Sequence, residues 1–186
     1  YDSFIDNKTV NHAALGIEIL FNDGLIELFD IDKQYYSLIK TAVFNHNKYE
    51  IEPDLDNHTY LHCQIIRDGD KIDIFNTGLL ESFEAFLDVS QNVLENDMIS
   101  DDIFETFMQQ QTILSINRKT DLDRWVSFLA LVFGLNFTYS FEYVSKYSFL
   151  EKLIRRLDYK NLDSKMKMEQ IESCCKYFLK DKVESI

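Results

Sequence analysis

Glycine and proline are so scarce in this chain that they restrict its fold class. Its 186 residues include five glycines and one proline. An all-β domain needs many tight turns, and glycine and proline are the strongest signals for such turns. We therefore expect an all-α protein that folds as a single compact multi-helix domain over residues 1–186.

Apolar residues recur at helical spacing in several segments, which are separated by polar stop signals. We expect residues 1–10 to form a loop entering the first helix, and residues 50–57 and 91–98 to be polar connections. The expected helices span residues 12–21, 32–46, 60–75, 79–89, 101–110, 121–137 and 162–183. Stop signals at 22–24 and 76–78 end the first and third helices, and Asp32, Ser100 and Thr120 are expected to cap helices.

The stretch 60–75 reads YLHCQIIRDGDKIDIF and has an unusual polar face. At about 100° per residue, His62, Gly69, Asp70 and Asp73 all lie within roughly 60° of Ile66. Burying such a face costs free energy unless a cation or a hydrogen-bonding partner compensates the charge. The face is therefore either the solvated side of a surface helix or one wall of a metal or phosphate site.

All four histidines lie between residues 12 and 62, so we expect any chemistry in the first part of the chain. His12, at the start of its helix, is either a solvated neighbour of the cap or a metal ligand. His46, at the end of its helix, either caps the last carbonyl groups or binds a metal as a neutral ring. His62 either supports a ligand from outside the site or hydrogen-bonds a backbone carbonyl. His58 is expected to be exposed.

Three segments resemble the HD-domain superfamily of metal-dependent phosphohydrolases. IIRDGDKIDIF is similar to the last motif of that family, in which an aspartate followed by a basic and an apolar residue closes the site; the matching residue is Asp70. VNHAALGIEILFNDGLI, with His12, and IKTAVFNHNKYEI, with His46, match positions that are ligands in the two-metal branches. The resemblance covers residues 4–75. The family's first histidine and its His-Asp pair are absent, so they either precede Tyr1 in the natural protein or have been lost.

The resemblance implies a fold of the HD-domain type, with site residues in 1–78 and a helical continuation in 79–186. It implies a phosphohydrolase or phosphodiesterase that acts on a small phosphorylated substrate, expected to be a nucleotide, through metal-activated water. One alternative is a catalytically incomplete HD-like regulatory or interaction module. Another is a helical scaffold whose histidines are structural.

The resemblance also implies roles for individual residues. His12, His46 and Asp70 would bind one or two divalent transition metal ions, with manganese, iron, nickel, cobalt and zinc all compatible. His62, Asp73 and Arg67 would support those ligands or contact the substrate; no other catalytic group is assigned. Asp68 and Lys71 are left out of the site, because the helical geometry turns them away from Asp70.

The formal charge of −13 opposes binding to nucleic-acid polymers. A bound divalent metal reverses the local field, so a small phosphorylated substrate remains compatible. The amphipathic final helix is expected to pack on the core or on a partner, which leaves a homodimer open.

Cysteine spacing and the lack of long apolar runs indicate the compartment. Cys63, Cys174 and Cys175 have neither a disulfide framework nor zinc-site spacing, so we expect free thiols in a reducing compartment. No apolar run reaches the roughly 18 residues of a membrane span, and we expect no leader segment. The expected location is cytoplasmic, without membrane association.

Overall fold

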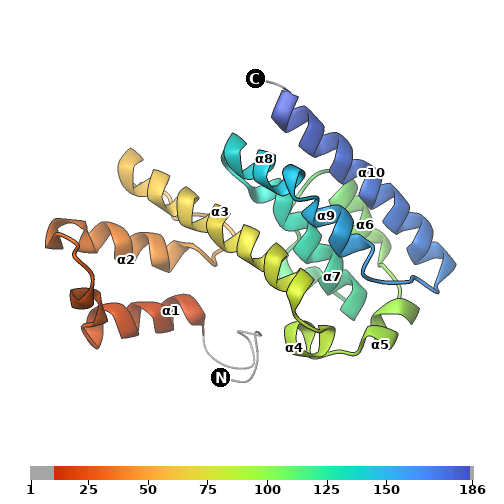
Figure 1. Ribbon diagram of the computed structural model, residues 1–186, viewed down its shortest axis with the longest axis horizontal. Coiled ribbons are helices and arrows are strands. Elements are labelled where there is room, and N and C mark those ends of the chain that lie inside the picture. Colours follow the sequence, from red (N-terminus) through yellow and green to blue (C-terminus); the bar gives the residue numbers. More distant parts are fainter. Residues whose placement is uncertain (1–10, 185–186) are drawn as a thin grey trace. The chain divides into compact units, whose positions relative to one another are not determined.

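The computed structural model describes residues 11–184, and every regular element within that range is helical. The expected all-α class is therefore confirmed, while the loop expected at residues 1–10 lies outside the described residues. The chain divides into two compact units, Tyr1–Asp70 (unit 1) and Lys71–Ile186 (unit 2). The division falls inside the long helix α3, Asn57–Leu80 (Figure 1). No helix within residues 11–184 is long and apolar enough to cross a bilayer.

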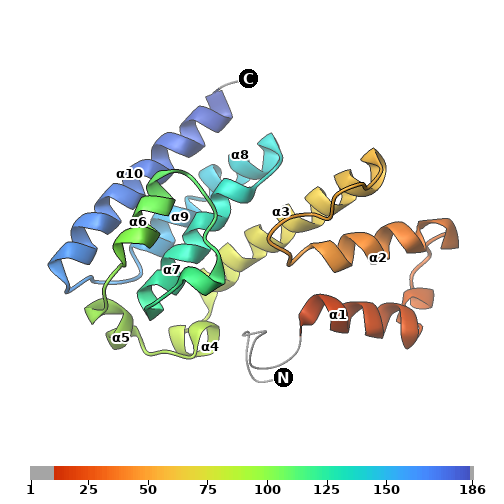
Figure 2. The ribbon, with the colours of Figure 1, turned by 180° about the vertical axis from the view of Figure 1, so that it is seen from behind.

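Unit 1 contains two antiparallel helices, α1 (His12–Ile17) and α2 (Tyr36–Asn45), which lie side by side in Figure 1 and Figure 2. The expected helix at 12–21 is thus shorter in α-helical form, because the chain continues as a π-helical turn, Glu18–Asn22. It stops where Gly24 adopts a φ of 80°, a left-handed conformation that favours glycine. The predicted stop at 22–24 is confirmed.

Carboxylates cap the two longer helical segments of unit 1. Asp32 accepts a hydrogen bond from the backbone N–H of Gln34, as expected, and starts the helical segment that leads into α2. Asp56 accepts from the N–H groups of His58 and Thr59 and so starts α3. Two 3₁₀ turns complete the connection between α1 and α2: Leu25–Leu28 and Lys33–Tyr35.

Unit 2 packs its helices around a continuous apolar core that extends along the chain from Phe75 to Leu179. The long helix α10 packs against α6, α8 and α9, as both ribbon views show (Figure 1, Figure 2). Trp125 and Phe107 are among the largest fully buried side chains. Besides the second part of α3, the α-helices of this unit are α4 (Phe83–Leu87), α5 (Gln91–Asn96), α6 (Asp101–Met108), α7 (Asp121–Leu129), α8 (Thr138–Lys146), α9 (Phe149–Ile154) and α10 (Leu162–Glu184).

The expected cap of α7 is present as a capping box, in which Thr120 and Asp123 bind each other's backbone N–H groups. The carboxylate of Asp123 is fully buried and also accepts from Lys119 N–H and from both the N–H and the hydroxyl of Ser100. Because Ser100 precedes α6, one carboxylate holds the beginnings of α6 and α7 together.

Helix α3 runs past the stop that was predicted at residues 76–78, so that boundary is wrong. Gly78 is buried and helical; a Cβ atom there would lie 3.1 Å from Leu153 Cδ2 and 3.7 Å from the Phe86 ring. Its carbonyl accepts a hydrogen bond from Arg156. The glycine therefore permits close packing inside a helix rather than ending one, and the next helix starts only at the Ser82 cap.

Two further predicted elements are wrong. Residues 91–98 are not a plain connection but contain α5, in which Leu94 is buried and Gln91 hydrogen-bonds Glu95 one turn later. A single buried residue is too weak a pattern to reveal so short a helix. The helix predicted at 121–137 ends as α7 at Leu129 and tightens into a 3₁₀ turn, Ala130–Gly134. Buried residues continue through this turn, so hydrophobic periodicity cannot mark the end of α7.

Substitutions at two glycines of α3 are expected to change the free energy of unfolding in opposite directions. Gly78→Val is expected to lower the free energy of unfolding by about 1–3 kcal/mol, because the side chain overlaps Leu153 in a packed core. Gly69→Ala is expected to raise it by up to about 1 kcal/mol, because Gly69 is helical, exposed and has no heavy atom within 4 Å of an added Cβ. Urea denaturation followed by far-UV circular dichroism measures the free energy of unfolding of both variants. A Gly69→Ala variant less stable than the native chain would contradict the placement of Gly69 at an exposed helical position with room for a Cβ atom.

Candidate metal centre

His12 is the first residue of α1 and is held by the cap of that helix. Asn11 occupies the N-cap position, and its side-chain oxygen accepts from the backbone N–H of Ala14 at 3.1 Å. The same oxygen accepts from the side-chain amide of Asn47, which follows α2, at 3.1 Å. The beginning of α1 is therefore fixed against the end of α2, and His12 is brought beside His46.

His46 caps the C-terminal end of α2 and uses one ring nitrogen to do so. Its Nδ1 donates to the carbonyl of Val43 at 2.6 Å. A carbonyl oxygen can only accept, so this bond places the proton of the neutral ring on Nδ1 and leaves a lone pair on Nε2. A hydrogen bond of this kind commonly orients the metal-binding histidines of proteins. The capping and ligand interpretations of His46 are thus compatible with each other.

Asp70 reaches the same place from α3. One turn earlier on that helix, Arg67 donates to the backbone carbonyls of Asn45 at 3.0 Å, of Lys48, and of Tyr49 at 2.9 Å. These carbonyls lie at and just beyond the end of α2, so the guanidinium caps α2 from outside the helix. Arg67 therefore fixes the segment that carries His46 against the segment that carries Asp70.

The three predicted ligands converge. His12, His46 and Asp70 each offer one ligand atom, and these atoms all lie within 4.8 Å of one another. The two histidine Nε2 atoms are 2.7 Å apart, a hydrogen-bonding distance. His12 is exposed, whereas His46 and Asp70 are half-buried, so the cluster is open to solvent on one side.

The donor set fits a divalent transition metal. Imidazole nitrogens bind zinc at about 2.0–2.1 Å, which places neighbouring ligand atoms roughly 3–3.4 Å apart. The Nε2 atoms of His12 and His46 would have to separate by a few tenths of an ångström, and the hydrogen bond between them would be replaced by bonds to the ion. Two imidazoles with one carboxylate suit manganese, iron, cobalt, nickel or zinc, and they leave coordination positions for water or substrate.

The three residues predicted to support the site lie outside the group of converging ligand atoms. The His62 ring packs edge-on against the ring of His58, with centroids 4.8 Å apart. Asp73 is exposed on α3. Arg67 binds backbone carbonyls at the end of α2 and so positions that end of the helix within unit 1.

Burial modifies the charged and thiol groups near the cluster. It lowers the pKa of Arg67, and the negative charge of Asp70 opposes that shift. It raises the pKa of the Cys63 thiol, which keeps this buried cysteine protonated and a poor ligand at neutral pH. The three cysteines are free, as expected, and all are buried.

Three asparagines that build the site were not predicted from the sequence. Asn11 and Asn47 join α1 to α2, and fully buried Asn45 accepts from the N–H of Glu52 while donating to the Thr41 carbonyl. Asn11 was recognisable as a preferred N-cap residue directly before the helix. The contacts of Asn45 and Asn47 depend on tertiary structure, and no local pattern reveals them.

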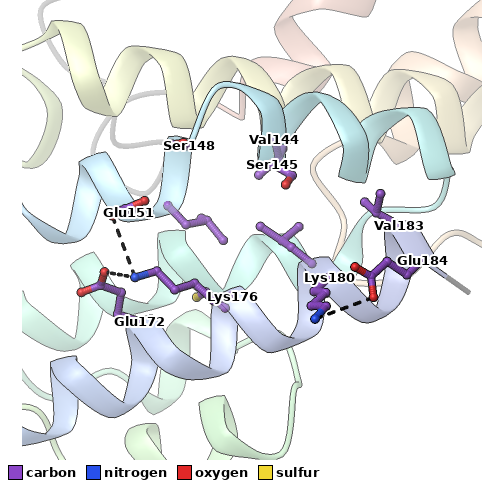
Figure 3. Close-up of a pocket in the computed structure, with 12 residues that line it drawn as sticks. Val144, Ser145, Ser148, Glu151, Glu172, Lys176, Lys180, Val183 and Glu184 are labelled. Carbon is purple, nitrogen blue, oxygen red and sulfur yellow. Dashed lines mark hydrogen bonds and ion pairs between the residues drawn. The ribbon is translucent and has the colours of Figure 1, made fainter.

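A separate pocket of about 360 Å³ lies in unit 2 between α8, α9 and α10 (Figure 3). Its apolar lining includes Val144, and the charged groups at its edge form ion pairs. Lys176 binds Glu172 at 2.6 Å, and Lys180 lies 3.9 Å from Glu184. The pocket has no histidine among its lining residues and shows no arrangement that identifies a ligand.

Arg67→Lys is predicted to weaken the site, because it loosens the contact between α3 and the end of α2. A lysine ammonium lacks the planar fork that reaches several carbonyls, so the free energy of unfolding of unit 1 is expected to fall by about 1.5–3 kcal/mol. Lys33→Ala is the matched control within unit 1, because Lys33 forms an exposed ion pair with Glu27 and should change stability by less than about 1 kcal/mol. Denaturation followed by far-UV circular dichroism compares the variants. Equal losses of stability in the two variants would contradict the role of Arg67 in fixing the end of α2 against α3.

Known proteins provide no further information about this site. Comparisons of the chain with family models, with curated proteins and with solved structures found no match.

Proposed function

We propose that this chain is a metal-dependent phosphohydrolase of the HD-domain type, in which His12, His46 and Asp70 hold a divalent transition metal. One observation supports the proposal above the others: two imidazoles and a carboxylate from three helices bring their ligand atoms within 4.8 Å of one another. The motif resemblance in the sequence selects the same three residues.

The metal would supply an activated water near neutral pH and would neutralise charge on a phosphate group. The protein's own groups hold the metal ligands in place and orient them. The bond from His46 Nδ1 to Val43 orients the ring and, in the neutral ring, leaves the lone pair on Nε2; Arg67 fixes the end of α2 against α3. Exposure of His12 leaves an approach for a substrate from solvent.

Charge limits the class of substrate. The chain carries a formal charge of −13, so a polyanion is repelled over most of the surface. A small phosphorylated molecule needs favourable charge only at the metal itself. A nucleotide or a similar small phosphoester is therefore the proposed substrate, and a nucleic-acid polymer is not.

A second candidate is a metal-binding interaction module without hydrolytic activity. It is favoured by the large apolar side chains that unit 1 exposes, among them Leu28 at 83% and Phe29 at 56% of their surface. Exposed apolar groups of this size are typical of surfaces that contact another protein. The two candidates share the metal site and differ only in whether the bound metal hydrolyses a phosphoester.

Hydrolysis assays separate the two candidates. Metal-stripped protein is supplied in turn with Mn²⁺, Fe²⁺, Co²⁺, Ni²⁺ or Zn²⁺ and tested on p-nitrophenyl phosphate, bis-p-nitrophenyl phosphate and nucleoside monophosphates. The phosphohydrolase proposal expects turnover with at least one metal, loss of turnover in Asp70→Ala, and retention in His58→Ala, which removes an exposed histidine of unit 1 outside the cluster. Metal binding without turnover of any of these phosphoesters would favour the interaction module.

A further inference from the structure

Within residues 11–70, the described part of unit 1, few apolar side chains are buried. The described buried apolar residues of this unit are Ala13, Ile26, Ala42 and Cys63. Most of these side chains are small, whereas larger groups such as Tyr60 and Ile65 on α3 stay 43% and 48% exposed. A small unit whose described residues form so small a core is usually stabilised by an additional cross-link, such as a disulfide or a metal ion.

Unit 2 differs, because its apolar core is continuous and contains the single tryptophan of the chain, Trp125. The Trp125 ring meets the rings of Phe83 and Phe86 edge-on, with centroids 5.1 and 6.4 Å away. Unit 2 therefore has the apolar packing to remain folded when unit 1 is perturbed, and Trp125 reports on its folding alone.

Three polar contacts join the helices of unit 1 at or near the metal ligands. Asn11 is joined to Asn47, His12 to His46, and Arg67 to the end of α2. The first two of these hydrogen bonds are exposed, so water competes with each and its net contribution is small. A six-residue helix such as α1 does not persist without tertiary support.

A cation shared by the three ligands would act on folding as well as on chemistry. His12 and His46 are 34 positions apart in the chain, and Asp70 comes from a third helix. Only the folded arrangement brings them together, so an ion that binds all three stabilises that arrangement over the unfolded one. The ion would provide the cross-link that the small core of unit 1 lacks.

We propose that metal occupancy controls the folding of unit 1: α1 and α2 are folded when the cluster is loaded and unfold when the metal is removed, while unit 2 stays folded. The inference rests on the metal binding of the proposed function and not on hydrolysis. It makes the chain a metal-responsive protein in which site and fold are established together.

Amide hydrogen exchange of the full chain, read by mass spectrometry, tests this inference. Exchange is compared after chelation and after addition of Zn²⁺. With free zinc near 100 times its dissociation constant, exchange within residues 12–46 is expected to slow by up to about a hundredfold. Peptides from α7 and α10 are expected to be unchanged.

Two variants and one optical signal complete the design. His46→Ala is expected to lose the zinc response, whereas His58→Ala, which removes an exposed histidine of the same unit outside the cluster, is expected to keep it. Trp125 fluorescence shows in each variant that unit 2 is folded. Zinc binding by calorimetry with no change in exchange over residues 12–46 would overturn the folding inference and leave the site intact. Absence of zinc binding would overturn both.

Discussion

His46→Ala is expected to lower the affinity of the chain for Zn²⁺ by at least about a hundredfold. The substitution removes the nitrogen that is already oriented for binding by the bond from Nδ1 to the Val43 carbonyl. Loss of a group that merely orients a ligand costs about 10–100-fold in affinity, so loss of the ligand itself should cost no less. Isothermal titration calorimetry on chelator-treated protein measures the effect.

The matched control separates metal binding from general damage. His58→Ala removes an exposed histidine of unit 1 whose atoms are outside the converging set, and we expect it to leave zinc affinity within about twofold of the native chain. Equal losses of affinity in the two variants would show that the effect does not arise from the cluster at residues 12, 46 and 70.

Asp123→Ala is expected to lower the free energy of unfolding of unit 2 by at least about 3 kcal/mol. The carboxylate has no solvent exposure and accepts bonds from Ser100, Lys119 and Thr120 at distances of 2.7–3.2 Å. Its removal leaves several part-buried donors without an acceptor. A buried donor without a partner costs about 1–3 kcal/mol, so the sum over these donors is expected to be large. Urea denaturation followed by Trp125 fluorescence measures the change.

Asp102→Asn is the control for this second prediction. Asp102 forms an exposed ion pair with Lys119 at 2.7 Å, so the loss of its charge should change the stability far less than the loss of Asp123. If Asp123→Ala proved no more destabilising than Asp102→Asn, the buried carboxylate would not be what joins the beginnings of α6 and α7.

Local chemistry in the sequence was sufficient to predict the helical class and several helix starts. Asp32 and Thr120 make the caps expected of them. Helix ends were harder to predict, because they depend on tertiary packing. Gly78 resembles a stop signal until Leu153 and Phe86 are seen against it, and the buried residues beyond Leu129 hide the end of α7.

The candidate site was predictable in part, for a related reason. The motif resemblance selected His12, His46 and Asp70, and the structure brings their ligand atoms together. Position along a helix placed His12 and His46 at helix ends, but it did not reveal that Arg67 binds carbonyls of the chain after α2. Contacts between residues about 20 or more positions apart, such as Arg67 with Asn45, depend on tertiary packing rather than on local spacing.

Anomalous X-ray diffraction at the zinc edge, from crystals of the zinc-loaded chain, tests most directly whether the three ligands share one ion. We expect an anomalous peak within about 2.3 Å of His12 Nε2, His46 Nε2 and a carboxylate oxygen of Asp70. The absence of a peak at this position, or a zinc ion bound by other residues of the chain instead, would contradict a metal site at these three residues.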